Sequence, residues 1–205
     1  MIKIFLNGGP VMWPLLCCSI VTVATVLERL FFILREHSRR KPELVDQILE
    51  RVEHHDLDDA IKIGSDNRDY VARVLTFALA HRAESFSSAV LRAANLELKQ
   101  FNRGLAVLDT IITLAPLLGL LGTVTGMIHA FGLLGAQQLD APEAITGGIS
   151  QALLATAFGL GIAITALIPF NYLNARLEEA RHDIEDAATQ LELHLEQGKE
   201  CKERP

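Results

Sequence analysis

Three long stretches of the chain carry no formally charged residue: residues 4–27, residues 110–139 with His129 counted as neutral, and residues 144–175. Each is longer than the ~20 residues that a helix needs to cross the hydrocarbon core of a bilayer. The chain is also 50% hydrophobic, and its mean hydropathy is +0.26. These features predict an all-α polytopic membrane protein with three transmembrane helices. They exclude an ordinary soluble enzyme, a disulfide scaffold and a disordered chain.

The basic residues lie on one side of this arrangement. Most of the 19 Lys and Arg residues fall within residues 35–103, several more follow residue 175, and residues 135–142 have none. Because Lys and Arg near the ends of spans mark the cytoplasmic side, the middle block and the C-terminus are predicted to be cytoplasmic. The N-terminus and residues 135–142 then face the opposite side. The net charge of −6 argues against a nucleic-acid partner, and the expected surroundings are a lipid bilayer.

The apolar stretches divide the chain into four predicted parts. Residues 1–34 hold the first transmembrane helix, from about residue 11, and residues 35–104 form a cytoplasmic helical region. Residues 105–175 contain the second and third transmembrane helices, and residues 176–205 form a cytoplasmic C-terminal helix and tail. Ser87 or Ser88 is expected to cap the last helix of the cytoplasmic region, and that helix is expected to continue unbroken into the second span.

The third apolar stretch is too long to end at the membrane surface. At ~1.5 Å per residue it extends ~48 Å, against a core of ~30 Å, so this helix is expected to project into the cytoplasm. The apolar residues of its extension repeat with coiled-coil-like spacing. They are Leu173, Leu177, Ala180, Ile184, Ala188, Leu191 and Leu195.

Both later spans carry small residues where two helices can approach closely. At 100° per residue, one narrow face of the third span is formed by Gly148, Ala152, Ala155, Gly159, Ala163 and Ala166. The neighbouring face is bulky, with Ile149, Leu153, Leu160, Ile164 and Leu167. The second span is punctuated by Pro116, Gly119, Gly122 and Gly126. Small faces of this kind pack against other helices in the membrane, so we predict that these residues form a helix interface.

Several runs in this sequence resemble the ExbB/TolQ/MotA family, the channel subunits of ion-driven inner-membrane motors. Residues 114–127 (LAPLLGLLGTVTGM) are similar to the family's second span, and residues 148–160 (GISQALLATAFGL) to its third. Residues 8–16 (GGPVMWPLL) and the run Leu27-Glu28-Arg29 resemble its N-terminal segment. The resemblance covers most of the chain, and a three-span layout fits the ExbB/TolQ branch.

The resemblance implies a function, partners and a location. An ExbB-like subunit forms a ring, typically a homopentamer, in the bacterial inner membrane around the single span of an ExbD-like partner. Protons moving through the assembly drive a TonB-like protein that energises TonB-dependent transport across the outer membrane. The N-terminus would then be periplasmic. Family threonines that line the channel correspond to Thr123 and Thr156 in this sequence.

Gln151 departs from the family pattern, because ExbB and TolQ commonly have a glutamate at this position. Glutamine does not exchange a proton near neutral pH, and residues 144–175 contain no Asp, Glu, Lys or Arg. An ionisable residue inside the membrane is the usual marker of an ion path. One interpretation is that Gln151 lines the ion path and forms hydrogen bonds beside a carboxylate from the partner. The other is that its side-chain oxygen is a ligand for sodium in a sodium-driven motor. A TolQ-like role and a non-conducting scaffold for a single-span partner remain alternatives.

No pattern in the sequence indicates an enzyme, a cofactor or a metal centre. His54 and His55 lie beside acidic residues, but adjacent positions on a helix point 100° apart, so a solvated acidic face is the better interpretation. His129 is a candidate proton relay or a packing histidine. The expected functional set is therefore Thr123, Gln151 and Thr156.

Overall fold

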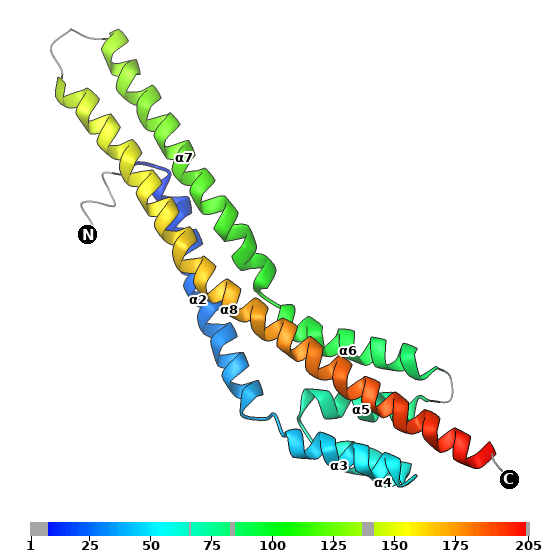
Figure 1. The fold of residues 1–205 in the computed structure, drawn as a ribbon. Coiled ribbons are helices and arrows are strands. Elements are labelled where there is room, and N and C mark those ends of the chain that lie inside the picture. Colours follow the sequence, from blue (N-terminus) through cyan, green and yellow to red (C-terminus); the bar gives the residue numbers. More distant parts are fainter. Residues whose placement is uncertain (1–7, 66, 83–84, 137–141, 204–205) are drawn as a thin grey trace. The chain divides into compact units, whose positions relative to one another are not determined.

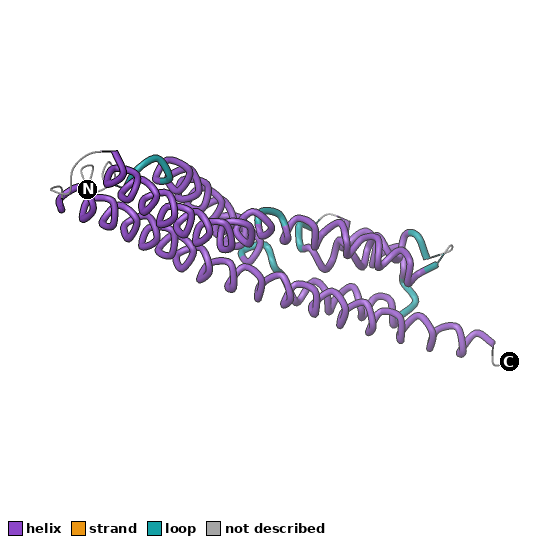
Figure 2. Tube along the Cα trace, turned by 90° about the horizontal axis from the view of Figure 1, so that it is seen from above, coloured by secondary structure: helices purple, strands orange, loops and turns teal. Residues whose placement is uncertain are grey.

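The computed structural model describes residues 8–65, 67–82, 85–136 and 142–203, which form helices joined by short loops with no strand (Figures 1 and 2). The helices are α2 (Met12–His37), α3 (Pro42–Glu53), α4 (Leu57–Ser65), α5 (Tyr70–Ala80), α6 (Phe86–Asn102), α7 (Leu105–Ala136) and α8 (Pro142–Glu203). The predicted all-α class is confirmed.

Three of the helices are long and apolar enough to cross a membrane. Within the described residues they are Met12–His37, Leu105–Gly132 and Thr146–Glu196, which confirms the three predicted spans. The 62 residues of α8 correspond to ~93 Å of helix, about three times the thickness of the hydrocarbon core. This helix therefore extends well beyond a membrane, as its sequence predicts.

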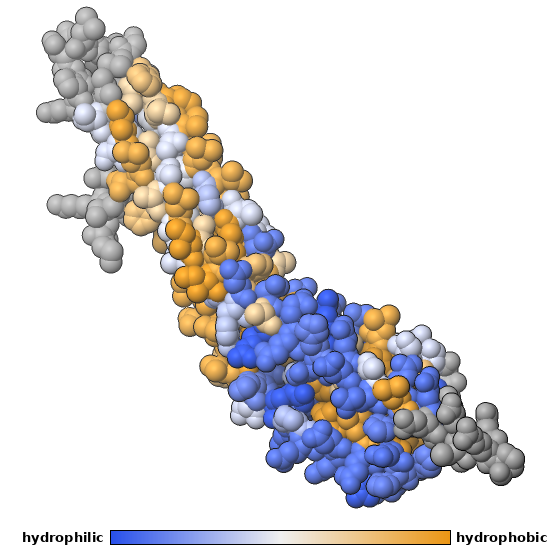
Figure 3. Space-filling model, viewed as in Figure 1, coloured by the Kyte–Doolittle hydropathy of each residue, from blue (hydrophilic) through white to orange (hydrophobic). Residues whose placement is uncertain are grey.

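The chain divides into two compact units. The first contains Met1–Arg29 and Gly104–Tyr172, and the second contains Leu30–Arg103 and Leu173–Pro205. On the face shown in Figure 3, the surface of the first unit is mostly apolar and that of the second is mostly hydrophilic. The assignment of the four predicted parts to membrane and cytoplasm stays a prediction.

The first unit packs α7 and the first part of α8 together with α2. Many of its large apolar side chains remain exposed, including Trp13, Ile128, Leu153 and Ile168. Its buried residues include small ones such as Ala115 and Ala155, both 0% exposed. An apolar exterior around a small-residue interior is typical of a helical membrane bundle, because lipid tails cover the exterior.

The second unit is a helical bundle with a large side-chain core. Ile48 from α3, Leu75 and Leu79 from α5, and Ile184 and Leu191 from α8 are almost completely buried in it. The coiled-coil-like repeat of α8 thus faces this chain's own core. Its members Ala180, Ile184, Ala188 and Leu191 belong to the buried cluster, and Leu195 packs against it. The repeat therefore marks the α8 stripe that completes the bundle.

Local signals set several helix starts in the second unit. Pro42 occupies the first turn of α3, where its missing N–H costs nothing. Asp69 caps α5, because its carboxylate accepts hydrogen bonds from the backbone N–H groups of Val71 and Ala72 at 2.8 and 3.2 Å.

The prediction that Ser87 or Ser88 caps α6 is wrong. The cap is Ser85, whose backbone is extended and whose hydroxyl accepts a hydrogen bond from the Ser88 N–H at 3.4 Å. Ser87 and Ser88 lie inside the first turn of the helix. Three serines fall within four positions there, and the backbone of Ser85 selects among them.

The predicted continuation of α6 into the second span is also wrong. The helix α6 ends at Asn102, Arg103 has non-helical dihedral angles, and α7 begins at Leu105. Gly104 lies between them at a φ of +82°, a conformation that glycine adopts without the steric cost of a side chain. The helix is therefore interrupted at Gly104, before the second span begins.

Candidate functional site

The backbones of α7 and α8 approach each other closely at Gly159. A Cβ atom added to Gly159 would lie 2.5 Å from the carbonyl oxygen of Ala115 and 3.1 Å from the Cα of Gly119. Neither neighbour can yield, because both atoms belong to the α7 backbone. Glycine is therefore the residue that fits, as in the close packing of small residues between membrane helices.

The same contact continues toward the other end of the two helices. A Cβ on Gly122 would lie 2.3 Å from the Cβ of Ala155, and one on Gly126 would lie 3.1 Å from that of Ala152. Further along, a Cβ on Gly148 would lie 2.5 Å from the Cβ of Ala130. The α7–α8 interface thus consists of small residues from both helices over about three to four turns.

The remaining small residues lie beside this interface. Ala163 is 7% exposed and Ala166 is fully buried on the same side of α8. Pro116 stands inside α7 and is half-buried, next to the Ala115 carbonyl that meets Gly159. By contrast, Gly161 has no atom within 4 Å of its Cβ position, so it faces away from the contact.

Thr156 joins the two helices through its side chain. Its hydroxyl donates a hydrogen bond to the carbonyl oxygen of Gly119 on α7 at 3.1 Å. Thr123 behaves differently, because its hydroxyl donates to the Leu120 carbonyl of its own helix at 2.7 Å. The two threonines singled out by the sequence therefore have different environments, one in the helix interface and one within α7.

Gln151 contacts the start of the chain. Its Nε2 atom lies 1.7 Å from the position that a Cβ on Gly9 would take, and Gly9 has a φ of +75°. Any other residue at position 9 would therefore meet the Gln151 amide and also strain the backbone. The half-buried Gln151 side chain is thus held against the N-terminal segment, whereas Thr156 points to α7. Sequence reasoning missed this contact, although the Gly8-Gly9 pair was its signal.

The beginning of α2 packs on α7. Val11, Met12 and Leu15 form a buried cluster with Ile111 and Ala115. The Ala115 residue in this cluster carries the carbonyl that meets Gly159, and a Cβ on Gly122 would lie 3.6 Å from the Cγ1 of Val11, so the start of α2 packs beside the α7–α8 contact. Hydrophobicity alone did not indicate which residues of α2 face inward.

One buried charge lies at the far end of this packing. Arg29 is 3% exposed, and its Nε donates a hydrogen bond to a carboxylate oxygen of Glu28 at 2.9 Å. Its methylene groups lie under the turn at Gly104, where a Cβ would be 3.2 Å from the Arg29 Cδ. The guanidinium is buried along with its stem, and its ion pair with Glu28 offsets part of the cost of burying the charge.

A bulky apolar face of α8 remains largely uncovered by the residues that the structure describes. Ile149, Leu153, Leu160 and Ile164 are 45–64% exposed on the side next to the small-residue face. Lipid or a neighbouring helix covers such a face in a membrane. Among the described residues, no group of three His, Cys, Asp or Glu side chains is placed to hold a metal ion.

Comparison with known proteins places the chain in a family. A model of the MotA/TolQ/ExbB proton channel family matches residues 40–186. An ExbB-like biopolymer transport protein of Synechocystis is 38% identical over 200 residues, covering 92% of this chain and 76% of the relative. The biopolymer transport protein exbB1 of Vibrio cholerae is 31% identical over 205 residues, covering 92% of this chain and 85% of the relative. The Tol-Pal system protein TolQ of Haemophilus influenzae is 34% identical over 104 residues, 49% of this chain and 46% of the relative.

The three apolar helices and the tightly paired spans define a multi-pass protein of the inner membrane. The chain belongs to the MotA/TolQ/ExbB proton channel family. It is thus a subunit of an ExbB/TolQ-type membrane motor.

Proposed function

We propose that the chain is the channel-forming subunit of an ExbB-type motor that uses the proton gradient to energise TonB-dependent transport across the outer membrane. The observation that carries this proposal is the α7–α8 interface. Glycines at 119 and 159 bring the two backbones together, and the Thr156 hydroxyl joins them. Two spans joined in this way are expected to move as one rigid pair when an ion or a partner binds at their surface.

The proposed ion path runs past Thr123, Gln151 and Thr156. All three side chains hold oxygen atoms that can accept hydrogen bonds from water or ligate a cation, and none carries a charge. Because residues 144–175 contain no acidic or basic side chain, the titratable group must come from elsewhere. In this proposal an aspartate in the single span of an ExbD-like partner supplies it, and Gln151 forms a hydrogen-bonding wall beside it.

The proposed assembly is a ring of five copies with the partner's span in the central pore. The exposed face of Ile149, Leu153, Leu160 and Ile164 would meet lipid or a neighbouring subunit. The energy released by ion movement would drive a TonB-like protein. The N-terminus would be periplasmic and the C-terminus cytoplasmic, since the Lys and Arg residues follow the first and third spans and precede the second.

Gln151 favours two further candidates. A channel whose own residues offer only neutral oxygen ligands suits sodium as well as protons. A chain without a titratable residue in its third span is also a plausible non-conducting scaffold for the partner. The match to a TolQ protein supports a Tol-type role as another version of the same motor.

Reconstitution into liposomes separates the channel from the scaffold. The purified chain and an ExbD-like single-span protein would be inserted together or separately, and proton and sodium flux would be measured under an applied potential. The channel proposal expects flux only with both proteins present. If a complex of both proteins conducts neither ion, the channel proposal is wrong and the non-conducting scaffold is favoured.

Topology is tested independently of flux. A tag at residue 1 should be reached from the periplasm and a tag at residue 205 only from the cytoplasm. Cytoplasmic labelling of residues 135–142 would contradict the proposed orientation.

A further inference from the structure

A tight turn precedes α2 and is fixed to the second span. The backbone N–H of Met12 donates a hydrogen bond to the carbonyl oxygen of Gly9 at 3.2 Å, and that of Trp13 donates to Pro10 at 3.3 Å. Met12 is 1% exposed and belongs to the buried cluster that α2 forms with α7. Its side chain also fills the space beside Gly8, where a Cβ would lie 2.4 Å from the Met12 Cγ. Backbone hydrogen bonds and a buried side chain therefore hold the turn in place.

The side-chain amide of Gln151 lies against this turn. Measured from the position that a Cβ on Gly9 would take, the Nε2 of Gln151 is at 1.7 Å, its Cδ at 2.7 Å and its Cγ at 3.3 Å. The amide therefore occupies the volume that a side chain at position 9 would need. Gly9 also has a φ of +75°, so position 9 requires glycine for two separate reasons.

The same amide leaves α8 beside the contact between the two later spans. Gln151 lies four residues before Ala155, which places the two side chains about 40° apart around the helix. Ala155 is completely buried, and its Cβ would be 2.3 Å from a Cβ on Gly122. The Cγ1 of Val11 would be 3.6 Å from that same Cβ on Gly122. The turn, α7 and α8 thus meet around Gln151.

Gln151 has hydrogen-bonding capacity that the described part of the chain does not use. Its side chain is half-buried, and no described residue forms a hydrogen bond with its amide. A side-chain amide has two N–H donors and an oxygen that accepts two hydrogen bonds. Because an unpaired polar group is costly in a bilayer, this amide requires water or a group from a partner. Its orientation determines which of these it reaches.

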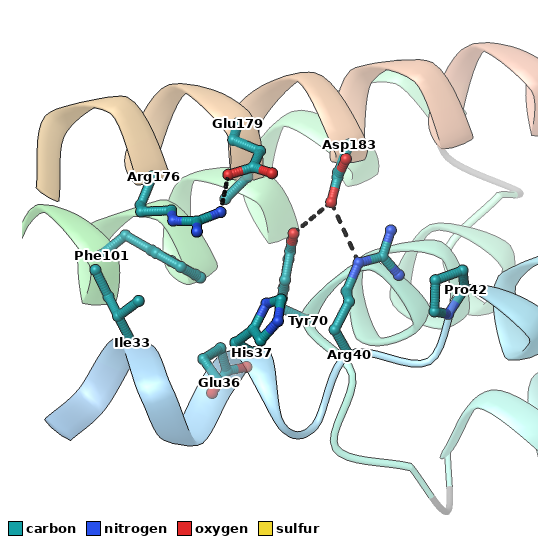
Figure 4. Close-up of a pocket in the computed structure, with 11 residues that line it drawn as sticks. Ile33, Glu36, His37, Arg40, Pro42, Tyr70, Phe101, Arg176, Glu179 and Asp183 are labelled. Carbon is teal, nitrogen blue, oxygen red and sulfur yellow. Dashed lines mark hydrogen bonds and ion pairs between the residues drawn. The ribbon is translucent and has the colours of Figure 1, made fainter. Parts of the chain in front are cut away.

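The charged side chains around the cavity of the second unit differ, because they are already paired with one another. The Tyr70 hydroxyl and the Arg40 Nε both donate to Asp183, at 2.6 and 3.2 Å (Figure 4). The Arg176 Nη1 donates to Glu179 in the same cavity. These groups satisfy each other, whereas the amide beside the N-terminal turn does not have a partner among the described residues.

We propose that the turn at Gly9 is a positioning element of the ion path, which holds the Gln151 amide in one orientation. Gly9 contacts neither the ion nor the partner, so it acts only through Gln151. With one side of the amide fixed by the turn, its hydrogen bonds are directed to the water or the carboxylate in the path. The start of the first span thereby controls a polar group of the third. This inference rests on the proposed place of Gln151 in the ion path.

The test measures proton flux against pH in liposomes that contain the full-length chain and an ExbD-like single-span protein. Gln151→Ala and Gly9→Ala should each change the proton concentration of half-maximal flux about tenfold, in the same direction, as expected for one lost hydrogen bond. Because both changes remove the same oriented amide, the double variant should behave as Gln151→Ala does. Gly147→Ala is the control, since it lies one turn before Gln151 with no atom within 4 Å of its Cβ position.

Backbone strain at position 9 is separated from the contact by a second substitution. Asparagine adopts a positive φ more readily than alanine, so Gly9→Asn reduces the strain but still displaces the amide. It should change the pH profile as Gly9→Ala does. Circular dichroism identifies any variant that fails to fold. In addition, Gly9→Ala should lower the thermal midpoint more in the unchanged chain than in Gln151→Ala, where the amide is absent.

The outcomes distinguish this inference from the channel proposal. If Gln151→Ala changes the pH profile and both Gly9 variants keep it, the turn does not position the amide, and Gln151 keeps its place in the path. Equal midpoint losses from Gly9→Ala in the two backgrounds would also overturn the inference. If Gln151→Ala itself leaves the profile unchanged, the proposed place of Gln151 in the ion path is wrong, and the role of Gly9 falls with it.

Discussion

The hydroxyl of Thr156 on α8 donates its hydrogen bond to the backbone carbonyl of Gly119 on α7, at 3.1 Å. Other threonines of the membrane spans, including Thr110, Thr123 and Thr165, donate to carbonyls of their own helix. Thr156 thus links the two spans beside the close approach of Gly119 and Gly159. It lies in the helix interface and, in our proposal, beside the ion path.

Thr156→Val should weaken the pairing of the two spans without preventing assembly. Valine keeps the shape of threonine and removes the donor, so we expect a loss of about 1 kcal/mol, seen as a lower thermal midpoint in detergent. Thr156→Ser should keep the midpoint close to that of the unchanged chain.

Thr123→Val is the matched control, because it removes a bond within one helix. Ion flux in the reconstituted complex should fall for Thr156→Val. If Thr156→Val and Thr123→Val have the same midpoint, the interhelical bond does not contribute to stability.

Gly159→Ala should be poorly tolerated although it adds a single methyl group. Its Cβ would lie 2.5 Å from the Ala115 carbonyl oxygen, so the backbones must separate, at a cost of about 1–3 kcal/mol. Gly159→Leu should prevent assembly altogether, and Leu160→Ala should be mild because that side chain is 48% exposed.

Gly161→Ala controls for the loss of a helical glycine. Its Cβ position is open, and alanine favours helix, so the midpoint should stay or rise. Size-exclusion chromatography reports assembly for all four variants. Equal behaviour of the alanine variants at 159 and 161 would contradict the proposed interface.

The sequence alone was sufficient to predict the three spans and the two faces of α8. Uncharged length determines the spans, and residue size along a helical period separates the small face from the bulky one. The helix interruption at Gly104 was not predicted, because the polar helix before it and the apolar helix after it are not separated by a proline, which would have indicated a helix end. Its signal was the single glycine between Arg103 and Leu105, whose positive φ appears only in the structure.

The sequence indicated candidate residues for the site and did not indicate their contacts. Motif positions singled out Thr123 and Thr156 together, yet the choice between a bond to the same helix and a bond to α7 depends on packing. The contact between Gly9 and Gln151 joins parts of the chain that no local period relates. The same holds for Asp69 with Arg40, and for Tyr70 with Asp183, which meet only after the second unit has folded.

Ile184→Ala should destabilise the second unit strongly. Ile184 is 1% exposed in the core that α8 completes, and such truncations cost about 2–5 kcal/mol. Leu193→Ala, on the same helix but 54% exposed, should change stability by less than about 0.5 kcal/mol. Thermal unfolding followed by circular dichroism compares them. Equal losses would mean that the repeat of α8 does not pack in this core.

Tyr70 should make the fold sensitive to alkali. Burial, and then the hydrogen bond to the negatively charged Asp183, raise the pKa of Tyr70 above its ordinary value. Because the folded state holds this proton more tightly, the stabilisation is fully present below about pH 10 and is lost as the pH rises further. The unchanged chain should therefore lose more thermal stability between about pH 9 and pH 11 than Tyr70→Phe does.

Tyr172→Phe serves as the control, since these are the only two tyrosines of the chain. Its pH dependence should match that of the unchanged chain. If thermal stability falls with pH equally in the Tyr70→Phe and Tyr172→Phe variants, Tyr70 ionises equally easily in the folded and unfolded states, and the prediction is wrong.

In our proposal, this subunit conducts only with a carboxylate from its partner, because its third span has none. The direct measurement is proton flux in liposomes that contain the chain with its single-span partner, compared with the same complex in which the partner's membrane aspartate is replaced by asparagine. We predict that this replacement abolishes flux while the complex stays assembled. We also predict that Gln151→Glu in the chain keeps flux with the unchanged partner and alters its pH dependence. Full proton flux with the asparagine partner would contradict the account.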